Sequence, residues 1–175
     1  MTQLVALSLS IAVLGAIWAF CALGPLSGFV LVWAGFIAWG CFFQAGGDVK
    51  ALQKTIVGTV YGAVVAWIAL LIIVNVPIAA MGAIWPAIVV GVTVFFLVIV
   101  ASVELLSAVP ANVYGYAALV GYSLHQPSAL QNLGAASFAN PLVLLVVSLV
   151  IGALLGYVSG QLTKALTAGK TPAAA

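Results

Sequence analysis

The chain has 175 residues, of which 66% are hydrophobic and 3% are charged, and its mean hydropathy is +1.38. Soluble domains carry about 25% charged residues, so this chain has too few charges to cover a water-facing surface. The net charge of +2 rests on four scattered lysines, which excludes the basic patch that nucleic-acid binding needs. The composition therefore predicts an integral membrane protein with an all-α fold, surrounded mainly by the lipid bilayer.

Six apolar stretches, each about as long as a membrane-spanning helix must be, follow one another along the chain. The turn-forming sequence GPLSG at 24–28 separates the first two, and the semi-polar segment 125–140 separates the last two. Asp48 is placed to cap a short interfacial helix, and Asn140 is placed to cap the last span. The spans are expected at about residues 3–23, 27–45, 55–74, 84–106, 110–124 and 141–161.

The lysines follow the second and the sixth span, as Lys50, Lys54, Lys164 and Lys170. Six spans put both pairs on one side of the membrane, and the positive-inside rule then predicts cytoplasmic termini. If the fifth segment only dipped into the membrane, the last two lysines would face outward, so the rule favours six spans. We expect one integral membrane domain over 1–164, followed by a short flexible cytoplasmic tail at 165–175.

The two cysteines are predicted to be free thiols. Cys21 falls near the outer end of the first span and Cys41 near the inner end of the second. At 1.5 Å per residue their depths differ by roughly 20 Å, whereas a disulfide tolerates only about 7 Å between Cα atoms. No CxxC or HxxxH spacing occurs in the chain, so neither a metal nor another cofactor is expected.

Two segments three spans apart have a similar order of features. Residues 34–53 can be laid on 111–130, which matches small residues, alternating aromatic and small residues, a polar break, and then KALQ with SALQ. A shift of three spans reverses the direction through the membrane, so this match predicts a 3+3 inverted repeat. The alternative is that any two glycine-rich apolar segments align this well. Inverted repeats are typical of transporters and channels, whose substrate path lies between the repeats.

Glycines four positions apart let helices approach each other closely in lipid. They are expected to pack helices within the chain or within a homo-oligomer, and the alternative is a groove that docks a different membrane partner. The glycines assigned to helix packing are Gly58, Gly62, Gly152, Gly156 and Gly160.

Candidate solute-binding residues are the polar and aromatic groups at membrane depth. The Asn112 amide must find hydrogen-bond partners in lipid, either in the neighbouring turn or on a passing solute. Glu104 falls about 30 Å along the fourth span, where it is either a solvated carboxylate, a charge at a pore mouth or a proton-linked site. His125 is interpreted as a solvated loop residue. The residues predicted to line a pore or to bind a solute are Trp33, Trp39, Phe43, Glu104, Asn112, Tyr114 and Tyr116.

The chain shows no sign of an enzyme. A Ser/His/Asp set, a carboxylate pair and a phosphate-binding loop cannot be assembled from its residues. General acid–base catalysis needs a titratable group within reach of another polar group, and the spans contain one acid at most. We therefore expect a protein that is not an enzyme.

Two blocks carry a resemblance to a family. The first follows the pattern WAGF…F…GG…K…L and the second the pattern S-x-V-P-x-x-x-x-G-x-A; they consist of Trp33, Ala34, Gly35, Phe36, Phe43, Gly46, Gly47, Lys50 and Leu52, and of Ser107, Val109, Pro110, Gly115 and Ala117. The chain resembles, over about 31–160, the small bacterial inner-membrane proteins of the YcdZ type, a domain of unknown function. The resemblance implies a multi-spanning protein of the bacterial inner membrane with no established reaction. Asn112 and Glu104 lie outside both blocks.

The leading hypothesis is a passive channel or facilitator for a small, mostly uncharged solute, assembled as a homo-oligomer. Energy-coupled transporters usually carry paired acids or bases inside the membrane, and the spans lack such pairs. Trp39 and Tyr116 would face each other across one cavity, with aromatic rings at its constriction. The alternative is a non-transporting small subunit, or a substrate-capture subunit, that packs against another membrane protein.

Overall fold

The computed structural model describes residues 1–126 and 128–168, and this part of the chain is all-α. The all-α prediction is therefore confirmed. The tail was predicted at 165–175, of which residues 169–175 lie outside the described part, and the last helix continues to Thr167. The α-helices are α1 (Gln3–Leu23), α2 (Val32–Gln44), α3 (Val49–Asn75), α4 (Ile84–Ile99), α5 (Val109–His125) and α6 (Pro141–Thr167). Short 3-10 turns are η1 (Ala79–Met81), η2 (Val100–Ser102), η3 (Glu104–Leu106) and η4 (Leu130–Asn132).

Both predicted N-caps stand at the start of a helix. The carboxylate or amide oxygen of each accepts a hydrogen bond from a backbone N–H that has no partner within the helix. Asp48 Oδ1 accepts a hydrogen bond of 2.7 Å from the N–H of Ala51. Asn140 Oδ1 accepts one of 2.9 Å from Leu142. The expected short interfacial helix after Asp48 is wrong, since the helix that Asp48 starts continues without a break to Asn75 as α3.

Within the described residues, four helices are long and apolar enough to cross a membrane: α1, α3, α4 together with η2, and α6. The other two are shorter, with 13 residues in α2 and 17 in α5. At 1.5 Å per residue they are about 20 and 25 Å long, less than the hydrocarbon thickness of about 30 Å. Helix α2 is shorter than the span expected at 27–45, because the GPLSG turn and the residues after it delay its start until Val32, whereas α5 covers the segment expected at 110–124.

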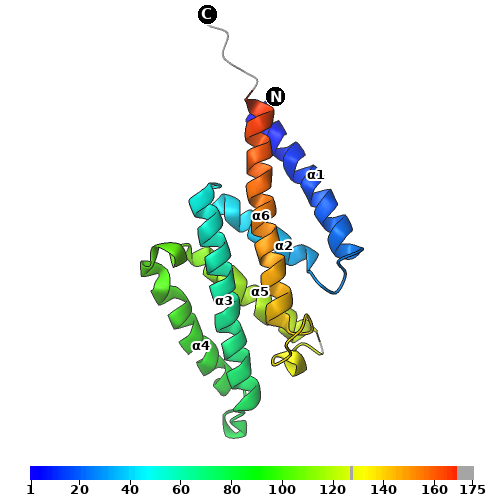
Figure 1. Ribbon diagram of the computed structural model, residues 1–175. Coiled ribbons are helices and arrows are strands. Elements are labelled where there is room, and N and C mark those ends of the chain that lie inside the picture. Colours follow the sequence, from blue (N-terminus) through cyan, green and yellow to red (C-terminus); the bar gives the residue numbers. More distant parts are fainter. Residues whose placement is uncertain (127, 169–175) are drawn as a thin grey trace, which may run out of the picture.

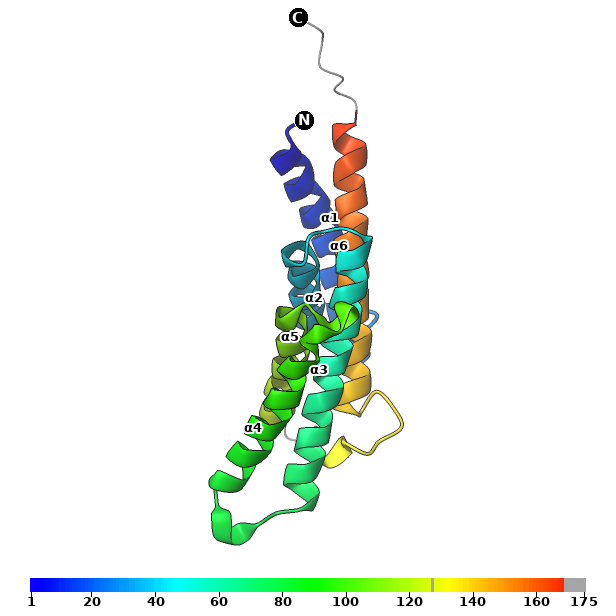
Figure 2. The same ribbon diagram turned by 90° about the vertical axis from the view of Figure 1, so that its left-hand side faces the viewer.

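The six helices form two pairs with two crossing helices between them. Helices α1 and α6 lie side by side, and α3 and α4 lie side by side at the opposite end of the bundle (Figures 1 and 2). The short helices α2 and α5 cross between the pairs, α2 packing mainly on α6 and α5 mainly on α3. Helix α1 begins and α6 ends at the same end of the bundle (Figure 1).

Glycines occupy the points where these helices come closest. A Cβ at Gly62 of α3 would overlap the carbonyl of Asn112 on α5, and one at Gly152 of α6 would overlap the carbonyl of Gly35 on α2. At Gly58 an added Cβ would lie 2.7 Å from the side chain of Ala111. Backbones packed this closely gain van der Waals contact, which drives helix association where lipid removes the hydrophobic effect.

The remaining two glycines of the packing set differ from each other. A Cβ at Gly156 would lie 2.9 Å from the ring of Phe42 on α2, whereas one at Gly160 would lie 3.9 Å from that ring, an ordinary van der Waals distance.

Cys41 is buried and Cys21 half-buried, and both are free thiols, as predicted.

Two indoles, from the buried Trp18 and the half-buried Trp67, hold loops and helix ends in place. Trp18 Nε1 donates to the carbonyl of Val32 at 2.9 Å, which holds the start of α2 against α1. Trp67 Nε1 donates to the carbonyl of Leu133 at 2.8 Å, which holds the loop before α6 against α3. An indole N–H away from water must find such an acceptor, so each bond fixes a loop in place.

Candidate functional site

An open groove of about 690 Å³ separates α2 from α5. The two helices bury their opposite faces against α6 and α3, so most of the groove-lining residues are not covered by another helix, although Cys41 and Ala118 line the groove and are also buried. The lining residues are Trp33, Phe36, Ile37, Gly40, Cys41 and Gln44 from α2, with Tyr114, Ala117, Ala118, Gly121, Tyr122 and His125 from α5 and Gln126 after it.

The middle of the groove is lined by small residues, and its two glycines have no packing role. At Gly40 and at Gly121 an added Cβ would meet no atom within 4 Å. Neither residue has a positive φ. Glycine in a helix interior costs up to about 1 kcal/mol relative to alanine, and no contact inside the bundle explains that cost here. What the two glycines provide is space in the groove.

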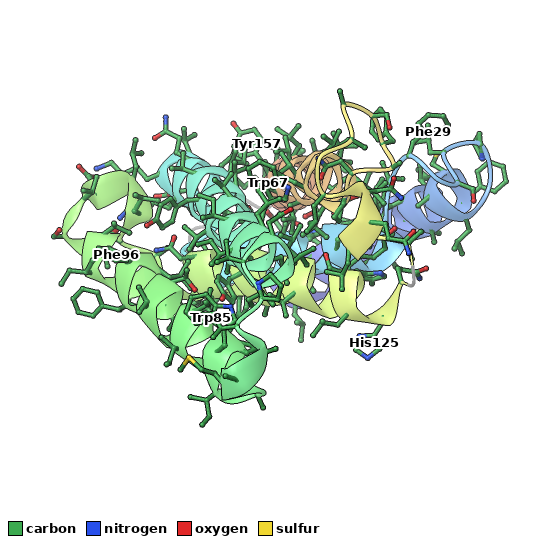
Figure 3. The ribbon with its side chains drawn as sticks, turned by 90° about the horizontal axis from the view of Figure 1, so that it is seen from below. Phe29, Trp67, Trp85, Phe96, His125 and Tyr157 are labelled. Carbon is green, nitrogen blue, oxygen red and sulfur yellow. The ribbon has the colours of Figure 1, made fainter. Side chains whose placement is uncertain are left out.

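Polar groups lie at both ends of the groove. The first turn of α2 lies beside the last turn of α5, so the two helices run in opposite directions (Figures 1 and 3). Gln44 in the last turn of α2 therefore lies at one end of the groove, and His125 and Gln126 lie at the other. His125 is exposed, and its Nδ1 is 2.7 Å from the carbonyl of Gly121. The groove thus has an apolar middle with hydrogen-bonding ends.

Charge is absent from this lining. Among its described residues there is no Asp, Glu, Lys or Arg. Within residues 1–126 and 128–168, no three His, Cys, Asp or Glu side chains gather as metal ligands would. The groove is therefore suited to binding by ring contacts and hydrogen bonds rather than by ion pairing.

Of the seven sequence-predicted site residues, only Trp33 and Tyr114 line the groove. Trp39 is 2% exposed and donates from Nε1 to Ser159 Oγ on α6 at 3.0 Å. Tyr116 is also buried, with its hydroxyl 3.0 Å from Thr93 Oγ1 on α4. Trp39 and Tyr116 do not face each other across one cavity, because each turns toward the helix that covers its own flank.

Asn112 is fully buried and holds the irregular segment after α4. Its Nδ2 donates to the carbonyl of Leu97 at 3.2 Å and to that of Leu106 at 3.1 Å. These carbonyls need a donor because α4 ends at Ile99, earlier than the predicted span, and continues as 3-10 turns. Asn112 Oδ1 has no hydrogen-bond partner. The amide thus stabilises the turn between α4 and α5. Of the two roles expected for Asn112, the structure shows hydrogen bonding to the neighbouring turn.

Glu104 and Phe43 lie away from the groove. Glu104 stands in η3 with its side chain 75% exposed, and its Oε1 is 4.0 Å from Lys50 Nζ at the start of α3. Phe43 is half-buried, and its ring makes an edge contact with that of Phe42 at a centroid distance of 5.1 Å. Neither side chain lines the groove.

Sequence reasoning missed several lining residues, among them Phe36, Gly40, Gln44 and His125. The signal in α2 was a helical spacing, since Trp33, Ile37, Gly40 and Gln44 recur every three or four positions and so share one face. That face could not be recognised as open without knowing that α6 covers the other one.

Comparison with known proteins places the chain in a family without assigning an activity. The chain belongs to the family described as protein of unknown function (DUF1097), whose family model matches residues 8–164. No curated protein matches the chain, and no solved structure matches it. The site must therefore be interpreted from its own geometry.

Proposed function

We propose that the protein is a membrane channel or facilitator that passes a small, mostly uncharged solute along the groove between α2 and α5. The observation that carries this proposal is a groove between two crossing helices, lined by both halves of the chain and free of charged side chains over its described lining. We propose no enzymatic activity for this protein. We also propose that, within its family, it is of the YcdZ type found in bacterial inner membranes.

A 3+3 inverted repeat is part of this proposal, and the burial pattern supports it. When residues 34–53 are laid on 111–130, every buried residue of α2 falls on a buried residue of α5. The aligned pairs are Ala34 with Ala111, Gly35 with Asn112, Ala38 with Gly115, Trp39 with Tyr116, Cys41 with Ala118, and Phe42 with Leu119. The packing agrees with the same repeat, because α2 packs on α6 and α1 lies beside α6, just as α5 packs on α3 and α4 lies beside α3.

The groove lies where such a repeat would place a substrate path. Four aligned positions line it from both halves: Ile37 with Tyr114, Gly40 with Ala117, Cys41 with Ala118, and Gln44 with Gly121. An axis relating the two halves would run through the groove, so a solute would meet similar surroundings from either side. This favours passive movement over energy-coupled transport, which usually depends on paired charges inside the membrane.

The open side of the groove supports a homo-oligomer as part of the same proposal. A water-filled path cannot border directly on lipid, because its polar contents would lose their hydrogen-bond partners there. A second copy of the chain would provide the missing wall. We place this assembly in a bacterial inner membrane with six crossings and both termini in the cytoplasm.

Solute flux in proteoliposomes tests the proposal. The variants Gly40→Leu and Gly121→Leu fill the groove, and their new side chains begin where no atom lies within 4 Å. We expect at least a tenfold loss of flux of small neutral solutes in both variants. The matched control is Gly91→Leu, which also starts in open space but on α4, outside the groove.

Two results would count against the facilitator. Wild-type vesicles could show no flux above empty vesicles for any neutral solute tested. Alternatively, flux could be the same in Gly40→Leu, Gly121→Leu and wild type, which would place the path elsewhere. The Gly91→Leu control identifies any general effect of a leucine on insertion or folding.

The second candidate function is a non-transporting subunit, or a substrate-capture subunit, packed against another membrane protein. It is favoured by the outward face of α4, where large apolar side chains lie 44–60% exposed: Ile88, Val92, Phe95, Phe96 and Ile99. Copurification from native membranes separates the candidates. A stoichiometric foreign subunit supports the second function, and a homo-oligomer that conducts solute supports the first.

A further inference from the structure

The groove contains more aromatic surface than a path for water-sized solutes requires. Four rings line it, two from each helix: Trp33 and Phe36 from α2, and Tyr114 and Tyr122 from α5. Three of these residues are 39–42% exposed, namely Trp33, Phe36 and Tyr114. Rings presented from two sides of a groove can stack on a flat ligand, since aromatic rings prefer offset or edge contacts with other rings.

One of these rings is held rigidly in place. Phe36 stacks on Trp39 with the ring centroids 5.7 Å apart and the planes within 3° of parallel. Trp39 is itself fixed by its hydrogen bond to Ser159 on α6. A ligand that stacks on Phe36 therefore meets a surface whose orientation is already set, which lowers the entropy cost of binding.

The size of the groove points to an organic molecule. A volume of about 690 Å³ lies within the range of about 300–1,000 Å³ that is typical of sites for drug-sized ligands. A water molecule occupies about 30 Å³ in the liquid, so a single small solute would leave most of the groove unfilled. The open space above Gly40 and Gly121 lies in the middle of this volume, where a flat ring would be placed.

The chemistry of the lining sets the charge of the ligand. With no carboxylate, lysine or arginine among its described lining, the groove offers no counter-charge to an organic ion. The hydrogen-bonding groups lie at its two ends, with Gln44 at one end and His125 and Gln126 at the other. A ligand that matches both features has a flat neutral body and a polar group at its edge.

We propose that the groove binds a neutral, flat aromatic molecule that carries a hydrogen-bonding group, with the ring between the aromatic side chains and the polar edge toward one end. This names the substrate class of the same groove, and it rests on the proposed function. The ligand is held by ring stacking and hydrogen bonding, so substituents that add a charge weaken binding.

Equilibrium dialysis of indole against the protein in lipid nanodiscs tests this proposal, with protein-free nanodiscs measuring partition into lipid. We expect saturable binding by the wild type, lost in Gly40→Leu and unchanged in Gly91→Leu. Trp33→Leu keeps an apolar side chain but removes a ring, and should weaken binding at least tenfold. Tryptamine, a cation, and indole-3-acetate, an anion, should each bind at least tenfold more weakly than indole.

The outcomes separate this proposal from the facilitator. The ligand class is overturned if indole binding does not saturate, or if it is equal in wild type and Gly40→Leu. It is also overturned if tryptamine or indole-3-acetate binds as tightly as indole or more tightly. Flux of other neutral solutes without saturable indole binding overturns the ligand class and leaves the facilitator standing. Saturable indole binding without flux of any solute supports the ligand class and overturns the facilitator. Gly121→Leu repeats the groove test should Gly40→Leu fail to fold.

Discussion

Two sets of glycines in this bundle have opposite surroundings. At Gly62, Gly115 and Gly152 an added Cβ would overlap a backbone carbonyl of the facing helix, whereas at Gly40 and Gly121 it would meet nothing within 4 Å. The first set stands where backbones touch, and the second set lines the groove. The same residue type therefore serves close packing where α3 meets α5 and α6 meets α2, and open space on the groove faces of α2 and α5. Substitutions at matched positions test this distinction.

The largest effect is expected at the closest helix contact. In Gly152→Ala the new methyl group would overlap the carbonyl of Gly35, and backbone cannot move aside as a flexible side chain can. Overpacking a core typically costs about 1–3 kcal/mol, occasionally more, and we expect a loss of about 3 kcal/mol or more here. The measurement is thermal unfolding in detergent, with the monodisperse fraction followed by gel filtration.

Gly91→Ala is the control for this change, since it adds the same methyl group where no atom lies within 4 Å. If Gly152→Ala and Gly91→Ala unfolded at the same temperature as wild type, the close contact between α2 and α6 would not exist as described. The glycines described as closely packed would then not differ from the open ones.

The next effect concerns Asn112, whose counterpart in the aligned half is Gly35. Asn112→Ala removes the donor for the carbonyls of Leu97 and Leu106 and leaves space in the core. A buried group left without a partner costs about 1–3 kcal/mol, and the cavity adds to this cost, so we expect a total loss of about 2–4 kcal/mol. Unfolding in detergent measures it.

Binding separates a structural amide from one that contacts a solute. Because Asn112 lies outside the groove lining, Asn112→Ala should leave the affinity of folded protein for a groove ligand unchanged within about twofold. A selective loss of binding in protein that remains monodisperse would instead assign Asn112 to the solute path.

These contrasts show which features could be predicted from the sequence. The boundaries of α1 and the caps at Asp48 and Asn140 follow from local chemistry, apolar length and side-chain oxygens, and they match the structure. The start of α2 could not be predicted, because it depends on distant partners. Trp18 binds the carbonyl of Val32, and Ser148 accepts a hydrogen bond of 2.8 Å from the N–H of Leu31.

The site was less predictable than the fold for the same reason. Gly40 and Gly152 both stand among apolar residues in the printed sequence, and only the facing helix decides whether a glycine is covered or open. Trp33 and Tyr114 were identified because polar and aromatic groups at membrane depth are few. Trp39 was assigned with them, although its indole binds Ser159 on the covered side.

A smaller effect, of opposite sign, is expected at the open glycines. Gly40→Ala and Gly121→Ala add a methyl group that meets no neighbour, while alanine loses less backbone freedom on folding. We expect each to raise stability by about 0.5–1 kcal/mol, measured by the same unfolding assay. Destabilisation by either variant would show that the groove glycines are packed after all, for instance against a second copy of the chain.

The smallest effect is expected at the ion pair that joins the start of α3 to η3. Lys50 Nζ and Glu104 Oε1 are 4.0 Å apart, and the two side chains are 77% and 75% exposed, so water screens their attraction. Exposed pairs contribute about 0–1 kcal/mol, and Glu104→Gln should therefore change stability by less than about 0.5 kcal/mol. Flux through the groove should also be unchanged, because neither residue lines it. A large loss of flux in folded Glu104→Gln would instead show that this carboxylate acts as a charge at the mouth of the solute path. The path would then extend beyond the uncharged groove between α2 and α5.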